Sequence, residues 1–406
     1  MEENSANGTN YISLQPFIHQ VGGHSSLLCL DEETICKPVI DREQLFYETI
    51  PESLKSFVPV YYGIVKVRLI QDGDYITLSA TTPANYKLKP SENLKQLRVR
   101  RNGSIEVDSL SEEMVFDASD VSASLNPWVL KCHKEYITHL TSRMEDMQGP
   151  LKFIVLENLT WRFRLPCILD LKMGTRQYGD NDTLEKRQSK MVKVISTTSA
   201  KLGVRIAGMQ VYQASSGRFL CRNKLYGRTL TTAGFQNAVR NFLHDGTRLR
   251  TDALPPLIRR LEELRNVLTG LDSLRLYTTS LLLLYEGHRS INSNEVAGPG
   301  QQTTEQSGTE TRATRASSED RLLSPPSPDF RCRSVSCNPR DRKPFRPVGV
   351  VGEEPLTDVR IIDFAHSTHA TMDDKVIYSG PDNGFLLGLN NMIQLLKSIL
   401  ADPPSN

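Results

Sequence analysis

The first 159 residues alternate short apolar runs with turn-forming residues, a pattern typical of β-strands. The two runs on either side of the acidic turn Asp31-Glu-Glu33 predict a hairpin. Strands are predicted at 11–24, where Gly22 and Gly23 interrupt the run, and at 26–30, 34–37, 58–79 and 152–159. The first part of the chain is therefore expected to form an antiparallel sheet.

One segment of this part, 41–48, has the pattern of a helix. Asp41 is suited to capping the first turn, and Leu45 and Phe46 are expected to face inward. A short helix is also expected after Trp128, ending near Arg143.

The second part of the chain mixes the two periodicities, which predicts an α+β fold. Helices are predicted at 182–193, where Asp182 is a candidate N-cap, and at 235–244, 255–270 and 385–400, the last of them docked on the core. Strands are predicted at 166–173, 203–212, 219–226, 278–286 and 358–363.

Two segments have a different composition. Residues 87–120 are charged and poor in large apolar side chains, which predicts a long loop or a flexible insertion. Residues 287–349 are rich in Ser, Thr, Gln, Pro and Arg and cannot form a packed core, so we expect a disordered insertion. Ser324 and Ser327 each precede a proline there, and regulatory protein contacts through this insertion are one interpretation.

The run Pro166–Tyr178 carries an acid, Asp170, and a base, Lys172, two residues apart. Residues i and i+2 of a strand point to the same face, so the two charges should emerge together beside a turn at Gly174. This arrangement predicts a functional site, although an Asp-x-Lys pair is also common as a surface ion pair.

Several segments follow the order of a kinase-type nucleotide site. A glycine turn at Gly22 and Gly23 precedes a strand that ends in Lys37, which would reach the phosphates. The following helix offers Glu43, with Glu48 as the alternative, to hold that lysine. The alternative, without a functional role, is that Lys37 is an exposed lysine at the end of a strand.

Two later strands end in polar residues that suit the same kind of site. The strand at 152–159 exits through Glu157, Asn158 and Leu159, whose backbone could contact an adenine edge. A buried run ends in Asp363, the setting that presents a metal-binding carboxylate. Any buried strand ends in polar residues, so the polar segment Glu157–Leu159 alone is weak evidence for a nucleotide site.

Lys186, Lys190 and Lys193 lie at i, i+4 and i+7 on the helix predicted at 182–193. Like charges on one face repel, which favours an anionic partner, with a solvated helix face as the alternative.

Composition limits the choice of partners. The 406 residues contain 49 Lys and Arg and 47 Asp and Glu, a net charge of +2, so a globally basic surface for nucleic acid is not indicated. The first ten residues lack a signal-peptide pattern, no run resembles a membrane helix, and seven scattered cysteines form no disulfide or metal spacing. We expect a monomer of the cytoplasm or nucleus without membrane contact.

The motif Pro-x-x-x-Asp-x-Lys-x-Gly at Pro166, Asp170, Lys172 and Gly174 resembles the signature of the inositol polyphosphate kinase family. Within that family the chain is most similar to the inositol hexakisphosphate kinases, through His19-Gln-Val-Gly-Gly-His-Ser-Ser26, Ile35-Cys-Lys-Pro38, Arg42-Glu-Gln44, Gly208-Met-Gln-Val-Tyr212 and Ile362-Asp-Phe-Ala-His366. The family's Ser-Ser-Leu-Leu reads Thr279-Ser-Leu-Leu282 here, and Tyr178 stands where relatives often have histidine.

The resemblance implies two lobes as in protein kinases, an antiparallel-sheet N-lobe and a larger mixed C-lobe, with ATP between them. It implies a division of the chain into a flexible start (1–10), an N-lobe (11–159), a C-lobe (160–286 and 350–400), the 287–349 insertion and a flexible tail (401–406).

The implied reaction is Mg²⁺-dependent transfer of the ATP γ-phosphate to a phosphate of inositol hexakisphosphate, which gives diphosphoinositol pentakisphosphate. An inositol trisphosphate kinase or multikinase acting on ring hydroxyls is the alternative, and an inactive inositol phosphate-binding scaffold is the non-enzymatic one. The resemblance implies that Lys37, Asp170 and Lys172 are catalytic, that Asp363 holds the metal, and that ATP is bound by Gly22, Gly23, Lys37, Glu43, Glu157, Asn158, Leu159, Asp170 and Asp363. The implied acceptor-binding residues are Pro166, Cys167, Ile168, Leu169, Asp170, Leu171, Lys172, Met173, Gly174, Lys186, Lys190, Lys193 and His366.

Overall fold

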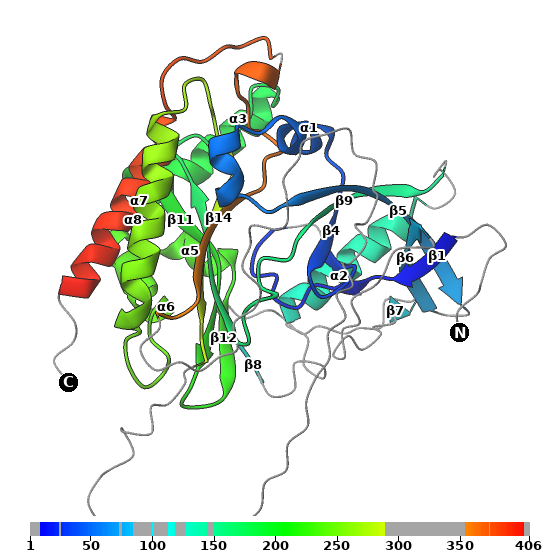
Figure 1. Cartoon of the computed structure of the whole chain (residues 1–406), viewed down its shortest axis with the longest axis horizontal. Helices are drawn as coiled ribbons and strands as arrows, with labels where there is room; N and C mark the ends of the chain where they lie inside the picture. The colour runs from blue at the N-terminus through cyan, green and yellow to red at the C-terminus, as the bar shows by residue number, and fades with distance from the viewer. Residues whose placement is uncertain are drawn as a thin grey trace, which may run out of the picture. The chain divides into compact units, whose positions relative to one another are not determined.

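The computed structural model describes residues 9–23, 26–72, 75–83, 99–100, 113–117, 127–143, 149–288, 354–372 and 374–401. Within these residues the chain forms two antiparallel sheets with helices around them, which confirms the α+β class (Figure 1). The predictions for 1–8, for most of 87–120, for 289–349 and for 402–406 lie outside the described residues.

The first sheet is built from the N-terminal half of the chain, in the order β1-β6-β5-β9-β4-β3-β2, and β7 pairs with β6. It confirms strands within the predicted ranges 26–30, 34–37, 58–79 and 152–159, including the β3–β4 hairpin, whereas the run predicted at 11–24 forms strands only as far as Pro16. The strands are β1 (Thr9–Ser13), β2 (Gln15–Pro16), β3 (Leu28–Cys29), β4 (Thr34–Pro38), β5 (Tyr61–Asp72), β6 (Tyr75–Pro83), β7 (Val99–Arg100) and β9 (Leu151–Glu157).

The second sheet has the order β14-β13-β10-β11-β12-β8. Its strands are β8 (Glu113–Asp117), β10 (Pro166–Met173), β11 (Val204–Gln213), β12 (Arg218–Arg222), β13 (Ser280–Glu286) and β14 (Thr357–Ile362). β7 and β8 lie in the segment that we expected to be a loop, and β8 pairs with β12 rather than with an N-terminal strand. This pairing explains how a charged segment can hold strands, because edge strands need only one neighbour.

Eight α-helices lie among the described residues: α1 (Asp41–Thr49), α2 (Pro127–Thr141), α3 (Leu184–Ile195), α4 (Ser199–Leu202), α5 (Lys224–Thr229), α6 (Thr232–Phe242), α7 (Leu254–Thr269) and α8 (Asn383–Ala401). Short 3₁₀ turns accompany them, η1 (Glu52–Phe57), η3 (Thr251–Ala253) and η5 (Ala370–Met372). α7 and α8 run side by side along the second sheet (Figure 1).

The long terminal helix α8 docks on the core, as its apolar spacing predicted. By length and composition alone it could cross a membrane, and it is the one such helix among the described residues. Its buried positions include Phe385, Leu389 and Leu396, which belong to the same apolar cluster as α7. The packing therefore accounts for its apolar character without a membrane.

Both predicted aspartate caps are wrong. α1 has Ile40 at its N-cap position and begins at Asp41, whose side chain makes no capping bond. α3 is capped by Thr183, whose hydroxyl accepts from the Lys186 N–H. The prediction for α1 was half right about its inner face, since Phe46 is fully buried while Leu45 is 39% exposed.

Candidate active site

Strand β10 lies at the centre of the second sheet, between β11 and β13, so all but one of its residues are buried. Its pairing places Lys172 between Ser280 of β13 and Arg205 of β11. The strand gives way to a turn at Gly174, whose φ of 88° is the left-handed conformation that glycine adopts readily. The predicted strand with two functional side chains beside a glycine turn is therefore present.

Lys37, at the end of β4, bridges two carboxylates from distant parts of the chain. Its Nζ lies 2.8 Å from Glu43 Oε1 of α1 and 2.8 Å from Asp363 Oδ1, which follows β14. Asp363 and Glu43 raise the pKa of this ammonium well above its ordinary value, although burial, the largest single effect, opposes them. Of the two acids considered for Lys37, the structure selects Glu43, while Glu48 accepts hydrogen bonds from Gln44 and Tyr61.

Asp363 is the meeting point of two lysines. Lys172 Nζ lies 3.5 Å from Asp363 Oδ2 and 3.4 Å from Ser280 Oγ. The backbone of Asp363 has a φ of 70°, a conformation that L-residues other than asparagine and aspartate seldom adopt. Aspartate is one of the residues that adopt this conformation, and here the two lysines hold its carboxylate in place.

Asp170 is a buried acid with unused hydrogen-bonding capacity. It is 5% exposed, and among the described residues its Oδ1 has no hydrogen-bond partner. Burial raises the pKa of Asp170 to about 6, and the nearby charge of Lys172 only partly opposes this. A side chain with this pKa exchanges a proton near neutral pH.

The glycine turn lies directly against Asp170. A Cβ atom added to Gly22 would be 2.2 Å from Asp170 Oδ2, so any other residue would force the turn away. Gly208 of β11 lies against the same turn. A Cβ atom there would be 2.0 Å from the Val21 carbonyl oxygen, so only glycine leaves room for the turn. Gly23 adds a φ of 85°. The structure thus brings the predicted glycines to the predicted acid.

The segment Glu157–Leu159, at the end of β9, is held by hydrogen bonds within the chain. The N–H groups of Glu157 and Asn158 already donate to the carbonyls of Val60 and Glu33. Their side chains are also engaged, Glu157 with Arg360 at 3.3 Å and Asn158 with the Glu32 carbonyl. These contacts fix the position of the segment, and its predicted contact with adenine stays a prediction.

The predicted lysine face of α3 is organised by Asp182. Lys186 Nζ lies 2.7 Å from Asp182 Oδ1, and Lys190 Nζ lies 3.6 Å from Asp182 Oδ2. The carboxylate also accepts from the Gly179 N–H, and although burial opposes these contacts, they lower the pKa of Asp182 to about 2. Asp182 thus fixes two of the three lysines, while Lys193 is exposed in the last turn.

His366 lies beside this helix. It packs on Gly179, where a Cβ atom would be 2.6 Å from His366 Nδ1. Burial lowers the pKa of His366, and the charges of Lys190, Lys186 and Lys172 lower it further, against the opposing effect of Asp182. The predicted acceptor side of the site is therefore one neighbourhood in which cations outnumber acids.

Arg205 is a site residue that the sequence analysis missed. It lies opposite Lys172 on β11 and donates to Ser199 Oγ at 3.2 Å. Burial and the neighbouring Arg228 lower its pKa to about 10, with Asp170 opposing. The signal was a lone charged residue within the apolar run at 203–212.

A lysine is held by a helix glutamate and by an aspartate at a strand end, and a glycine turn and a cationic acceptor region lie beside them. These features define a kinase-like phosphotransferase with an α+β fold. A family model described as inositol polyphosphate kinase matches residues 153–397. The chain belongs to the inositol polyphosphate kinase family, as its motifs predicted.

Similar proteins cover nearly the whole chain. Inositol hexakisphosphate kinase 1 of Mus musculus is 36% identical over 97% of this chain and 94% of its own length. The human protein of that name is 36% identical over 97% and 95%, and inositol hexakisphosphate kinase 3 of Mus musculus is 34% identical over 96% and 95%. Among solved structures, the inositol phosphate multikinase Ipk2 of S. cerevisiae, in complex with ADP and Mn²⁺, is 19% identical over 91% of this chain and 99% of its own, with a TM-score of 0.48.

Proposed function

We propose that this protein transfers the γ-phosphate of ATP to a phosphate of inositol hexakisphosphate and so makes diphosphoinositol pentakisphosphate. The convergence of Lys37 and Lys172 on Asp363, next to the buried Asp170, carries the proposal of phosphoryl transfer. The choice of acceptor is supported by the names of the relatives that are similar along nearly the whole chain.

The nucleotide side of the reaction belongs to Lys37 and the glycine turn. Lys37 is already oriented by Glu43 and would contact the phosphates of ATP. Gly22 and Gly23 let the backbone of the turn approach those phosphates, because no side chain intervenes. The adenine edge would meet the backbone of the segment Glu157–Leu159.

A divalent cation fits Asp363. No group of three or more His, Cys, Asp or Glu side chains that could hold a metal occurs among the described residues. Mg²⁺ does not need such a cage, because it is usually bound through one or two carboxylates, substrate phosphates and water. Asp363 would hold the cation, with Asp170 nearby, and the bound cation would neutralise charge on the transferred phosphate.

The acceptor side must overcome repulsion between two anions. At about 4 Å and an effective dielectric constant near 20, each pair of unit charges costs about 4 kcal/mol. Lys172, Lys186, Lys190 and Arg205 supply the opposing positive charge. An acceptor phosphate has a second pKa near 6, so at neutral pH it is largely ionised and needs little help from a base.

Product analysis tests the proposal. The purified protein is incubated with ATP, Mg²⁺ and inositol hexakisphosphate, which has no free hydroxyl, and the product is examined by ³¹P NMR. We expect a diphosphate signal on one ring position. Phosphorylation of inositol phosphates with free hydroxyls, without reaction of the hexakisphosphate, would instead assign the protein to the multikinase alternative.

A further inference from the structure

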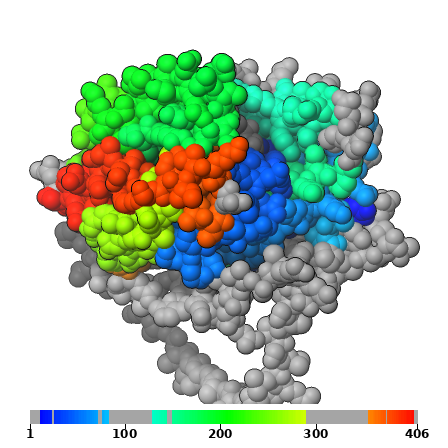
Figure 2. Space-filling view, turned by 90° about the horizontal axis from the view of Figure 1, so that it is seen from above, coloured from blue at the N-terminus to red at the C-terminus, as the bar shows by residue number. Residues whose placement is uncertain are grey.

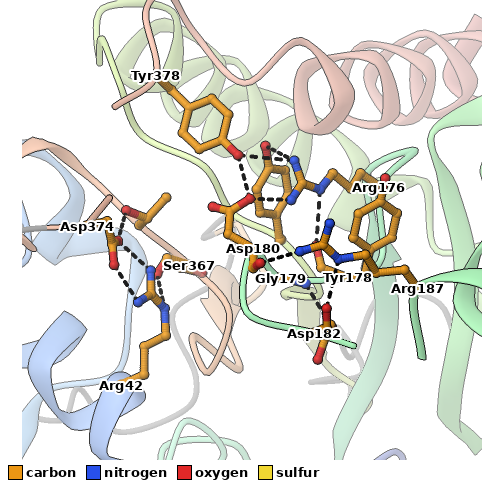
Figure 3. A network of polar contacts seen from close by, with 12 residues as sticks. Arg42, Arg176, Tyr178, Gly179, Asp180, Asp182, Arg187, Ser367, Asp374 and Tyr378 are labelled. Atoms are coloured by element: carbon orange, nitrogen blue, oxygen red, sulfur yellow. Dashed lines mark hydrogen bonds and ion pairs between the residues drawn. The ribbon is translucent and has the colours of Figure 1, made fainter. Parts of the chain in front are cut away.

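Arg42 of α1 makes three hydrogen bonds with one guanidinium group (Figure 3). Its Nη1 and Nη2 donate to the two carboxylate oxygens of Asp374 at 2.8 and 2.6 Å, and its Nε donates to the Ser367 carbonyl at 3.0 Å. The planar fork of arginine suits such a set of acceptors, whereas a lysine ammonium cannot reproduce it.

The next residue of α1 holds the other end of the same short segment. Glu43 Oε1 accepts from the Phe364 N–H at 3.3 Å and from Lys37 at 2.8 Å. Phe46, one helical turn later, stacks on the Phe364 ring at 4.3 Å. Helix α1 therefore fixes the segment 364–367 at both ends, and that segment carries His366.

Beyond Ser367 the chain continues into the segment 374–382, which reaches the acceptor side. Tyr378 Oη donates to Asp180 Oδ1 at 2.6 Å, and Arg176 donates to Tyr378 Oη at 3.1 Å and contacts Asp180. Asp180 lies in the turn between β10 and α3, two residues before Asp182 (Figure 3). The segment thus ties the start of α3 to Asp374.

These contacts join two parts of the site that are far apart in the sequence. On one side are α1, Glu43 and Lys37, and on the other are His366 and the beginning of α3. The surfaces of α1 and of the segment after β14 lie next to each other in the space-filling view, blue beside orange (Figure 2). We propose that Arg42 is a positioning residue, which holds His366 and the 374–382 segment in the arrangement that binds the acceptor.

The inference rests on the proposed function, because it assigns the acceptor side to an inositol polyphosphate. Arg42 and Asp374 have side chains that are 24% and 20% exposed. The pair is mostly buried and bidentate, so its removal should lower the melting temperature, and each variant is checked for folding by circular dichroism before its kinetics are measured. Lys37 keeps both of its carboxylates without Arg42, which is why nucleotide binding should change little.

The test compares Arg42→Ala, Arg42→Lys and Asp374→Asn with the wild-type protein. Lys397→Ala serves as a control for the loss of an ion pair elsewhere in the protein, because it removes a more exposed pair, 2.7 Å to Glu262, between α8 and α7. We expect Arg42→Ala to raise the KM for inositol hexakisphosphate about tenfold, while the Kd for ADP, measured by calorimetry without acceptor, changes less than twofold. The KM of Arg42→Lys for inositol hexakisphosphate should be closer to that of Arg42→Ala than to that of the wild type, because lysine cannot form the same set of hydrogen bonds.

Asp374→Asn keeps the shape of the side chain and the bond from Arg42 to Ser367, so it should show the same selective rise at a smaller size, about threefold. It also decides the question if Arg42→Ala fails to fold. The inference is overturned if soluble, folded Arg42 and Asp374 variants keep the wild-type KM for the acceptor, or if they lose ADP affinity in parallel. Either result leaves the proposed function standing. A wild-type protein that neither binds nor phosphorylates inositol polyphosphates overturns the proposed function and this inference with it.

Discussion

Replacing Asp170 with asparagine should stabilise the protein, and more at pH 8 than at pH 5, because it removes a buried charge. The carboxyl group of Asp170 has a pKa of about 6 in the folded protein, mainly because it is buried, against an ordinary value of 3.8. Its protonated form is therefore favoured by folding, and native stability falls as pH rises through this range. Asparagine has nearly the same shape and no charge to bury.

The size of the effect follows from the two pKa values. At 1.36 kcal/mol per pKa unit, the ionised carboxylate destabilises the fold by about 3 kcal/mol at pH 8 and by about half as much at pH 5. The stability advantage of Asp170→Asn should therefore grow by on the order of 1 kcal/mol between pH 5 and pH 8. Functional groups that reduce stability in this way are expected at active sites.

Urea unfolding at pH 5 and pH 8, in buffer free of nucleotide and divalent ions, measures the difference. Asp182→Asn is a control of opposite sign, because the contacts of Asp182 lower its pKa and its charge therefore favours the folded state at neutral pH. An advantage of Asp170→Asn that is equal at both pH values would refute the reasoning, since it would mean that Asp170 does not titrate in this range.

Two further predictions concern the donor and acceptor sides. Asparagine adopts the left-handed backbone of this position, so Asp363→Asn should leave the melting temperature within a few degrees of the wild type. The variant should nevertheless reduce kcat at least a hundredfold at any Mg²⁺ concentration. Activity that returns at high Mg²⁺ would contradict a direct role for the charge of Asp363 in turnover. Replacing Lys186, Lys190 and Lys193 together with alanine should raise the KM for inositol hexakisphosphate much more than the KM for ATP, because two of these lysines lie with His366 around Asp182. Equal changes in both constants would mean that the lysines of α3 only form a solvated face.

The sequence was sufficient to predict the residues whose roles depend on local order. Asp170 and Lys172 share a strand face because of their spacing, and Gly174 follows them as a turn. Lys37 and Glu43 follow each other within one strand–helix unit, so their contact was also predictable. Family membership followed from these motifs.

Contacts that depend on tertiary pairing were beyond the sequence. Arg205 faces Lys172 only because of the β10–β11 register, which no local pattern specifies. Arg42 reaches Asp374 across 332 positions of the chain, and nothing near either residue indicates the other. The caps failed for a related reason, since Asp182 uses its carboxylate for Lys186 and the Gly179 N–H.

Strands β13 and β14 are separated by 70 positions of the chain yet pair directly, with Tyr285 opposite Thr357. The end of β13 and the beginning of β14 therefore lie at neighbouring points of the sheet. The entropy of closing a connection between two such points grows only with the logarithm of its length, about 0.6 kcal/mol for each doubling. The length of the chain between these strands is therefore nearly free to vary, because it neither shifts the register of β13 and β14 nor displaces Asp363 at the end of β14.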